Sequence, residues 1–188
     1  MRSNVLLIGR NPSVLNDLAS ALTDEGFNVT TTNLVEQAVQ DFDGVDFDLV
    51  AFGRGVDEAT NHQLRMSFGN QNPKLIFVNG LAPLIPLLVK QIKLAVLGEQ
   101  AGKFLTAFVC VSADCKKVRV NVAVSCELTI DLYELDAIHQ TTQKRLISES
   151  VSAGLHEYSL AIDQNATSTI KFLAAEANEL DLLVLPIR

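Results

Sequence analysis

The 188-residue chain has no tryptophan, only two tyrosines and three cysteines, and it lacks any long apolar run. Cys110, Cys115 and Cys126 are an odd number in a chain of ordinary size, which predicts free thiols rather than a disulfide framework. No apolar run reaches about 18 residues, so no membrane-spanning helix is expected. The apolar residues 5–8 stand directly before a turn rather than before a small-residue cleavage site. These absences predict a cytoplasmic protein.

Basic residues are also scarce. The chain has 15 lysines and arginines against 22 aspartates and glutamates, for a net charge of −7. The deficit is shared evenly, with 7 basic and 10 acidic residues up to Gly98 and 8 and 12 beyond it. Neither half therefore carries the basic footprint that nucleic-acid binding requires. We expect no nucleic-acid partner and no membrane partner.

Residues that commonly carry chemistry are few and scattered. His62, His139 and His156 stand in separate segments, without a cysteine at zinc-ligand spacing and without a recognisable serine or cysteine partner. The turn at residues 9–12 lacks the Gly-x-Gly-x-x-Gly spacing of a dinucleotide loop, and Pro12 removes an amide that would face phosphate. The sequence predicts no metal, no cofactor and no enzymatic activity.

The first half alternates short apolar runs with segments of helical periodicity. Such alternation predicts right-handed crossovers and a parallel sheet in an α/β domain over residues 1–98. Asn11 and Pro12 supply an N-cap and a first helical position. The predicted strands are 4–8, 27–31, 47–53 and 75–78, and the predicted helices are 12–25, 33–42, 57–68 and 87–97.

The strand at 47–53 organises this half. Its apolar run follows an acidic turn, as in a strand that helices cover on both faces. Its C-terminal end should lie in the crevice where open α/β sheets bind ligands. Gly53 stands there, and glycine supplies no nucleophile, acid, base or metal ligand.

Three stretches, residues 5–12, 22–30 and 47–50, resemble the receiver domain of two-component response regulators, with a likeness that extends over about 4–97. The resemblance implies a flavodoxin-like fold. In active receivers an aspartate at the end of the third strand accepts phosphate, and an acidic pair after the first strand binds magnesium.

In this chain the residues at those positions have changed. Gly9 and Arg10 stand in place of the acidic pair, Gly53 in place of the phospho-acceptor, and Asn79 in place of the hydroxyl residue after the fourth strand. Without these carboxylates there is no oxygen cage for a hard cation and no nucleophile for a phosphoryl group. The resemblance therefore implies a pseudo-receiver that is not phosphorylated.

The receiver-like half also lacks a fifth strand and the helix before it, because residues 81–86 lead directly into the last helix. This truncation leaves the strand 75–78 at an open edge. The helix at 87–97 is apolar around most of its circumference, so part of it needs a second cover. We expect that cover from a homodimer or from the second half of the chain. The predicted interface residues are Leu87, Leu88, Ile92 and Leu94.

The second half, residues 99–188, changes to a period of two after a linker at 98–103. This alternation predicts antiparallel strands that form a β-sandwich. The stretch 127–162 resembles immunoglobulin- or fibronectin-like modules, although the chain has no tryptophan for the immunoglobulin pattern. The predicted strands are 104–111, 117–122, 127–133, 144–151, 156–162, 169–174 and 180–185.

Together these patterns indicate a non-catalytic regulatory or signalling module that interacts with a protein partner whose identity the sequence does not reveal. One alternative is a small-ligand binder or enzyme that uses the crevice at Gly9, Gly53 and Asn79. Arg10 and Arg54 would attract an anion there, unless nearby carboxylates pair with them. Another alternative is a structural or envelope-associated component, which only the sandwich suggests.

Overall fold

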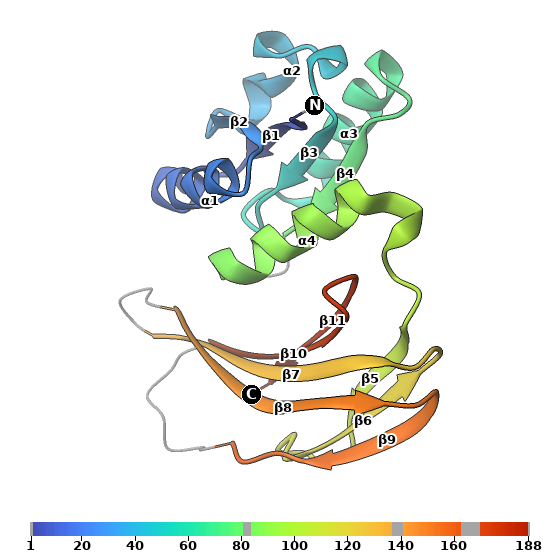
Figure 1. The fold of residues 1–188 in the computed structure, drawn as a ribbon. Helices are drawn as coiled ribbons and strands as arrows, with labels where there is room; N and C mark the ends of the chain where they lie inside the picture. The colour runs from blue at the N-terminus through green and yellow to red at the C-terminus, as the bar shows by residue number, and fades with distance from the viewer. Residues whose placement is uncertain (1, 81–83, 137–140, 163–169, 188) are drawn as a thin grey trace. The chain divides into compact units, whose positions relative to one another are not determined.

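The computed structural model describes residues 2–80, 84–136, 141–162 and 170–187. The chain divides into two compact units, Met1–Val96 and Leu97–Arg188 (Figure 1). The first contains a four-stranded parallel sheet, and the second contains antiparallel sheets. The predicted α/β fold followed by an antiparallel β-rich region is confirmed.

The parallel sheet has the strand order β2-β1-β3-β4. Its central strand β1 is buried from Val5 to Ile8 on both faces, as expected for a parallel strand covered by helices. β3 is equally buried along its length, which confirms the reading of the apolar run around it. The strands are β1 (Asn4–Ile8), β2 (Asn28–Thr32), β3 (Leu49–Phe52) and β4 (Ile76–Asn79).

Helices cover both faces of this sheet. One core cluster joins α1 and α4 to the sheet, and the other joins α2 and α3 to the opposite face (Figure 1). The helices are α1 (Pro12–Asp24), α2 (Ala38–Asp41), α3 (Glu58–Gln71) and α4 (Ile85–Leu97), with 3-10 turns η1 (Val35–Gln37) and η2 (Gly44–Asp46).

Local sequence explains where the helices begin. The Asn11 side chain accepts hydrogen bonds from the amides of Ser13 and Val14, at 3.0 and 3.4 Å, and Pro12 occupies the first helical position as predicted. The predicted single helix at 33–42 is wrong, because the segment forms η1 followed by the four-residue α2. No side chain caps its start at Leu34, so the chain enters a 3-10 turn instead.

β4 forms one edge of the sheet. Its ladder runs to β3, and the flanking bonds from Ile76 N to Asp48 O and from Gly80 N to Phe52 O continue it at 3.0 and 2.8 Å. No further strand joins the outer side of β4 among the described residues, and residues 81–83 lie outside them. The open edge of β4 in the described residues agrees with the missing fifth strand expected from the sequence.

The second unit has two antiparallel sheets with the strand orders β11-β10-β7-β8 and β5-β6-β9. One apolar cluster contains residues of both sheets. A 3-10 turn, η3 (Gly98–Gln100), opens the predicted linker. The strands are β5 (Leu105–Cys110), β6 (Lys117–Val122), β7 (Cys126–Leu135), β8 (Thr141–Val151), β9 (Gly154–Ser159), β10 (Ile170–Ala177) and β11 (Asp181–Ile187).

All seven predicted strands are present, but several have different ends. The predicted strand 156–162 begins earlier, at Gly154, because Gly154 pairs with Val122 of β6. The first and last strands of this unit are also tied by a buried carboxylate. Asp181 Oδ2 accepts hydrogen bonds from the amides of Phe104 and Leu105 at 2.9 and 2.7 Å. These two bonds satisfy an acid that would be costly to bury alone.

The prediction of three free thiols is wrong for two of them. Cys110 and Cys115 form a disulfide across the turn between β5 and β6, with their Cα atoms 4.9 Å apart. The odd number of cysteines argued against a network of several disulfides, but it does not exclude a single one. The turn between β5 and β6 brings Cys110 and Cys115 close enough to form it. Cys126 is a buried free thiol, and burial raises its pKa above the ordinary value.

Candidate functional site: the crevice at the ends of β3 and β4

The positions that the receiver resemblance singles out on β1, β3 and β4 meet at one edge of the sheet. Gly53 N donates to Ile8 O at 2.8 Å, so the ends of β1 and β3 lie side by side. Asn79 is the register partner of Phe52, which precedes Gly53. The structure therefore brings Gly9, Gly53 and Asn79 to the carboxyl ends of neighbouring strands, where open α/β sheets bind their ligands.

Space does not force glycine at either position. A Cβ atom on Gly53 would lie 3.5 Å from the Gly9 Cα, and one on Gly9 would lie 3.4 Å from Leu15 Cδ2, both ordinary or slightly tight contacts. Neither residue has the positive φ that favours glycine. An added Cβ atom would fit at both positions, so close packing of the backbone does not account for the two glycines.

Arg10 does not form an anion site with Arg54, because its guanidinium already contacts Gly55, Glu36 and Asp57. Its Nε donates to Gly55 O at 2.9 Å, and its Nη2 lies 2.6 Å from Glu36 and 3.8 Å from Asp57. The hydrogen bond to Glu36 raises the pKa of Arg10 and lowers that of Glu36. Arg10 thus joins three loops, and pairing with carboxylates is the outcome for this arginine.

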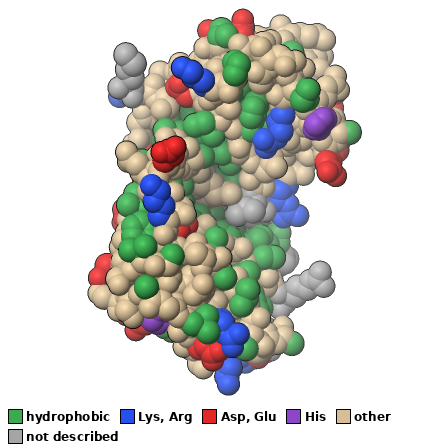
Figure 2. All heavy atoms as spheres, turned by 90° about the vertical axis from the view of Figure 1, so that its right-hand side faces the viewer, with side chains coloured by type: hydrophobic (Ala, Val, Ile, Leu, Met, Phe, Trp, Pro, Cys, Tyr) green, Lys and Arg blue, Asp and Glu red, His purple; other side chains and the backbone are tan. Residues whose placement is uncertain are grey.

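A pocket of about 940 Å³ opens at the ends of β3 and β4. The loop after β3 and the first half of α3 form its other walls. Figure 2 shows basic side chains and a histidine gathered on one face of this unit. The described lining residues are Phe52, Gly53, Arg54, Val56, Glu58, Ala59, Asn61, His62, Arg65, Asn79 and Gly80.

Arg65 is the most constrained polar side chain of this crevice. Its Nε donates to Asn61 Oδ1 at 2.7 Å and its Nη2 donates to Asn79 Oδ1 at 2.8 Å. Asn61 Nδ2 also donates to Asn79 Oδ1, at 3.0 Å. The guanidinium carbon lies 5.3 Å from the ring centroid of Phe52 and 5.1 Å from that of Phe77. These contacts fix the orientation of the cation.

The crevice holds more positive than negative charge, although the chain as a whole is acidic. Arg54 and Arg65 line it together with one acid, Glu58. Within the described residues, Arg54 and Arg65 form no ion pair with a carboxylate. Burial lowers the pKa of Arg65, which marks a cation whose lost hydration is not offset by a nearby negative charge. An anionic ligand would supply that charge.

Sequence reasoning missed Arg65 and Asn61. His62, the neighbour of Asn61, is exposed. Asn61 and Arg65 are four residues apart, which places them on one face of α3. That spacing, on the helix that follows the organising strand, was the signal that could have found them.

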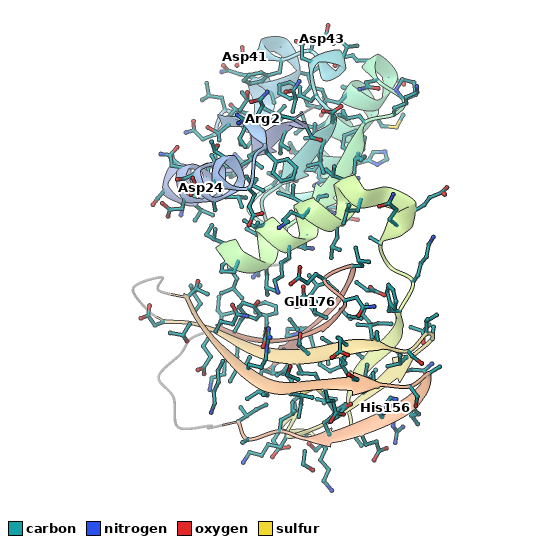
Figure 3. The ribbon with its side chains drawn as sticks, viewed as in Figure 1. Arg2, Asp24, Asp41, Asp43, His156 and Glu176 are labelled. Carbon is teal, nitrogen blue, oxygen red and sulfur yellow. A yellow bond between two sulfur atoms is a disulfide. The ribbon has the colours of Figure 1, made fainter. Side chains whose placement is uncertain are left out.

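Other residues considered from the sequence do not form a site. His156 lies on β9, where Nε2 is 2.8 Å from Ser152 O and the ring stacks on Tyr158 (Figure 3). His139 lies outside the described residues. In the part of the chain that the structure describes, no group of His, Cys, Asp or Glu could hold a metal ion, and no helix is long and apolar enough to cross a membrane. The acidic side chains Asp24 and Asp43 also stand apart, because Asp24 ends α1 and Asp43 precedes η2 (Figure 3).

The four predicted interface residues on α4 divide into two sets. Leu88 and Ile92 belong to the core cluster that includes Val5 of β1, so they pack against the sheet. Leu87 is buried outside that cluster, and Leu94 is half-buried. Of the four residues, Leu94 is the one that stays partly exposed, so it is the one left for a contact with a second chain.

No protein-family model matches the chain, and no curated protein matches it in sequence. Among solved structures it is similar to an NAD kinase from Archaeoglobus fulgidus in complex with ATP, with 12% identity and a TM-score of 0.35. That match covers 97% of this chain and 83% of the kinase chain.

The prediction that the chain is not an enzyme is corrected by this comparison, because the structure it finds is that of an enzyme. That prediction is withdrawn. A TM-score of 0.35 assigns neither a fold nor a kinase activity to this chain, so the chemistry of the crevice has to be argued from its own residues.

Proposed function

We propose that the N-terminal unit is a receiver-like regulatory module that binds a small anionic ligand in the crevice at the ends of β3 and β4. The observation that carries the proposal is the cationic lining of this pocket. Arg54 and Arg65 outnumber Glu58 in a chain of net charge −7. The volume suits a small organic molecule, and the pocket lies at the carboxyl ends of two parallel strands.

A thermal-shift screen tests the proposal with matched anionic, neutral and cationic small molecules. A ligand that binds only the folded protein raises the melting temperature in a concentration-dependent way, so anionic compounds should form the stabilising group. Ala59 is exposed on the first turn of α3 and lines the crevice, so Ala59→Trp should block binding without changing any charge. Stabilisation that persists in Ala59→Trp would place the ligand elsewhere and contradict the proposal.

A second candidate function is a receiver-like interaction module that cannot be phosphorylated. The strand order β2-β1-β3-β4 and the contact between Gly9 and Gly53 are compatible with it, and neither glycine, at the positions that the resemblance aligns with a receiver's acids, has a side-chain ligand atom. Intact-mass analysis after incubation with acetyl phosphate should show no added phosphoryl group. A hydroxylamine-labile adduct would contradict this candidate.

The structural or envelope-associated role has one observation in its favour. Disulfides such as Cys110–Cys115 persist in oxidising compartments and are rare in the cytosol. The predicted cytoplasmic location is therefore best tested by trapping thiols in intact cells, followed by fractionation. Alkylation of Cys110 and Cys115 in the soluble fraction would support the cytoplasmic prediction, whereas the buried Cys126 thiol is shielded in either compartment. An alkylation-resistant pair in an envelope fraction would support the alternative.

A further inference from the structure

One edge of the Arg65 guanidinium donates hydrogen bonds to neighbouring side chains, and the other has donors that remain available. Asn61 and Asn79 occupy the edge formed by Nε and Nη2. Nη1 donates to no acceptor within the described residues, and Nη2 has a second hydrogen. The end of the guanidinium, formed by Nη1 and Nη2, is therefore available as a two-pronged donor. This fork matches the spacing of two oxygens on one phosphate or carboxylate.

Neighbouring donors add to this fork. Asn79 accepts two hydrogen bonds through Oδ1, whereas its Nδ2 donates to no acceptor among the described residues. Arg54 lines the same crevice without an ion pair in the described part of the chain. An oxyanion between these groups would meet two guanidinium groups and an amide, and it would remain clear of Arg10, which Glu36 holds.

The count of charges and donors favours phosphate over carboxylate. A carboxylate carries one negative charge and two oxygens, which the Arg65 fork alone would use. A phosphomonoester carries up to two charges and three terminal oxygens, so it could also engage Arg54 and Asn79. Glu58, the one acid of the lining, repels a dianion more strongly than a monoanion, but Arg54 and Arg65 together outweigh it for either anion. The apolar residues Val56 and Ala59 offer a surface for the organic part of such a ligand.

We propose that the crevice is a receptor for an organic phosphomonoester, whose phosphate binds the free end of Arg65 with help from Arg54 and Asn79. The inference rests on the proposed function, since it names the ligand class of the same pocket. Asn61 and Asn79 act as positioning residues that hold the guanidinium edge-on to the pocket, and the rings of Phe52 and Phe77 keep it from turning.

The test is an NMR titration of the full chain with four probes of similar size or headgroup: phenyl phosphate, inorganic phosphate, benzoate and benzyl alcohol. Phenyl phosphate should shift the amide signals of the crevice and bind more tightly than benzoate. Arg65→Met should weaken phenyl phosphate binding on the order of 10- to 100-fold, the usual effect of losing a charge-assisted fork. Arg65→Lys keeps the charge without the fork and should lose most of the same affinity.

Arg119→Met is the matched control, because Arg119 lies on β6 and pairs with Glu157. It should bind phenyl phosphate like the unmodified chain. If Arg65→Met unfolds, Arg65→Lys and Asn79→Ala carry the test, and Asn79→Ala should weaken binding because it frees the guanidinium.

The outcomes separate this inference from the proposed function. Crevice shifts of equal strength with benzyl alcohol would contradict both proposals, because the crevice would then not select anions. Benzoate binding that equals phenyl phosphate binding would overturn the phosphomonoester inference alone and leave an anion-binding crevice in place. Binding of phenyl phosphate that is unchanged in Arg65→Lys would also overturn it. No crevice shift with any probe at millimolar concentration would contradict both proposals.

Discussion

The backbone of Gly53 packs against that of Gly9, so closely that a Cβ atom on Gly53 would lie 3.5 Å from the Gly9 Cα. This contact joins the ends of β3 and β1. Because 3.5 Å is an ordinary van der Waals distance, a Cβ atom at Gly53 meets no clash. We therefore expect this position to accept a side chain without loss of the fold.

We predict that Gly53→Asp folds with a melting temperature within a few degrees of the unmodified chain and still fails to bind magnesium. One carboxylate is insufficient for a hard cation that prefers octahedral oxygen ligands, and Gly9 and Arg10 supply none. Thermal unfolding with and without millimolar magnesium measures both effects.

The double variant Gly9→Asp/Gly53→Asp is the matched comparison for magnesium binding, since it adds a second carboxylate beside the one at position 53. A magnesium-specific stabilisation of Gly53→Asp alone would mean that other acids complete the site. A variant that unfolds would mean that the glycine contact is required by packing.

Gly44 should not tolerate even an alanine. A Cβ atom there would lie 2.9 Å from Gln71 Oε1 and 3.0 Å from Phe68 O. The amide of Gly44 also donates to Gln71 Oε1 at 2.7 Å, so the side chain cannot simply withdraw. We expect Gly44→Ala to lower the free energy of unfolding by about 1–3 kcal/mol, the usual range for overpacking.

Gly69→Ala is the control for Gly44→Ala, and urea unfolding measures the free energy of unfolding of both variants. This glycine lies inside α3, and the closest atom to an added Cβ is Phe77 Cε2 at 3.9 Å. Alanine should stabilise by about 0.5–1 kcal/mol, because it has the higher helix propensity. Equal effects of the two substitutions would contradict the geometry at Gly44.

Alkaline pH should destabilise the second unit through Tyr158. This side chain is half-buried and its hydroxyl donates to Glu149 at 2.7 Å. Burial, with the adjacent Glu149 carboxylate, raises its pKa above the ordinary value of 10. The unfolded chain then loses this proton first, so the contribution of Tyr158 is complete below pH 10 and is lost as the pH rises above it.

Urea unfolding at several pH values from about 8 to 11 measures this effect around the ordinary tyrosine pKa. Tyr158→Phe should have a shallower decline in stability with pH, because it has no proton to lose there. An unchanged slope in Tyr158→Phe would show that other groups cause the decline.

The homodimer stays a prediction that α4 can test. Leu94 is half-buried on this helix and does not belong to the parallel-sheet core cluster, so Leu94→Asp places a charge where a second chain would pack. Light scattering at micromolar concentration should give twice the chain mass of 20.4 kDa, and Leu94→Asp should reduce it to one chain without unfolding. A mass of 20.4 kDa for the unmodified chain would contradict the dimer.

Periodicity was sufficient for most of the fold. β1 and β3 are continuous apolar runs, and the Asn11-Pro12 cap leaves little choice of where α1 begins. It failed for the short helical segment after Leu34, which has no side-chain cap. It also failed for Cys110 and Cys115, because a disulfide depends on the distance between two side chains. Period and propensity contain no information on the distance between side chains.

The same limit applies to the candidate site. Gly53 and Asn79 were predictable because both end a strand of one parallel sheet. The role of Arg65 depends on contacts with Phe77 and Asn79, which come from a different element. A sequence without aligned relatives offers no means of joining α3 to β4 in this way.

The buried carboxylate of Asp181 has a consequence for how the second unit is made. It receives the amide of Phe104, 77 positions earlier in the chain, and so closes the unit by its first and last strands. During synthesis, residue 181 must leave the ribosome before this closure is possible. Until then β5 to β10 lack the contacts that β11 supplies. Long-range strand pairing of this kind folds in about milliseconds to seconds rather than microseconds. The second unit should therefore complete its folding only after β11 has emerged.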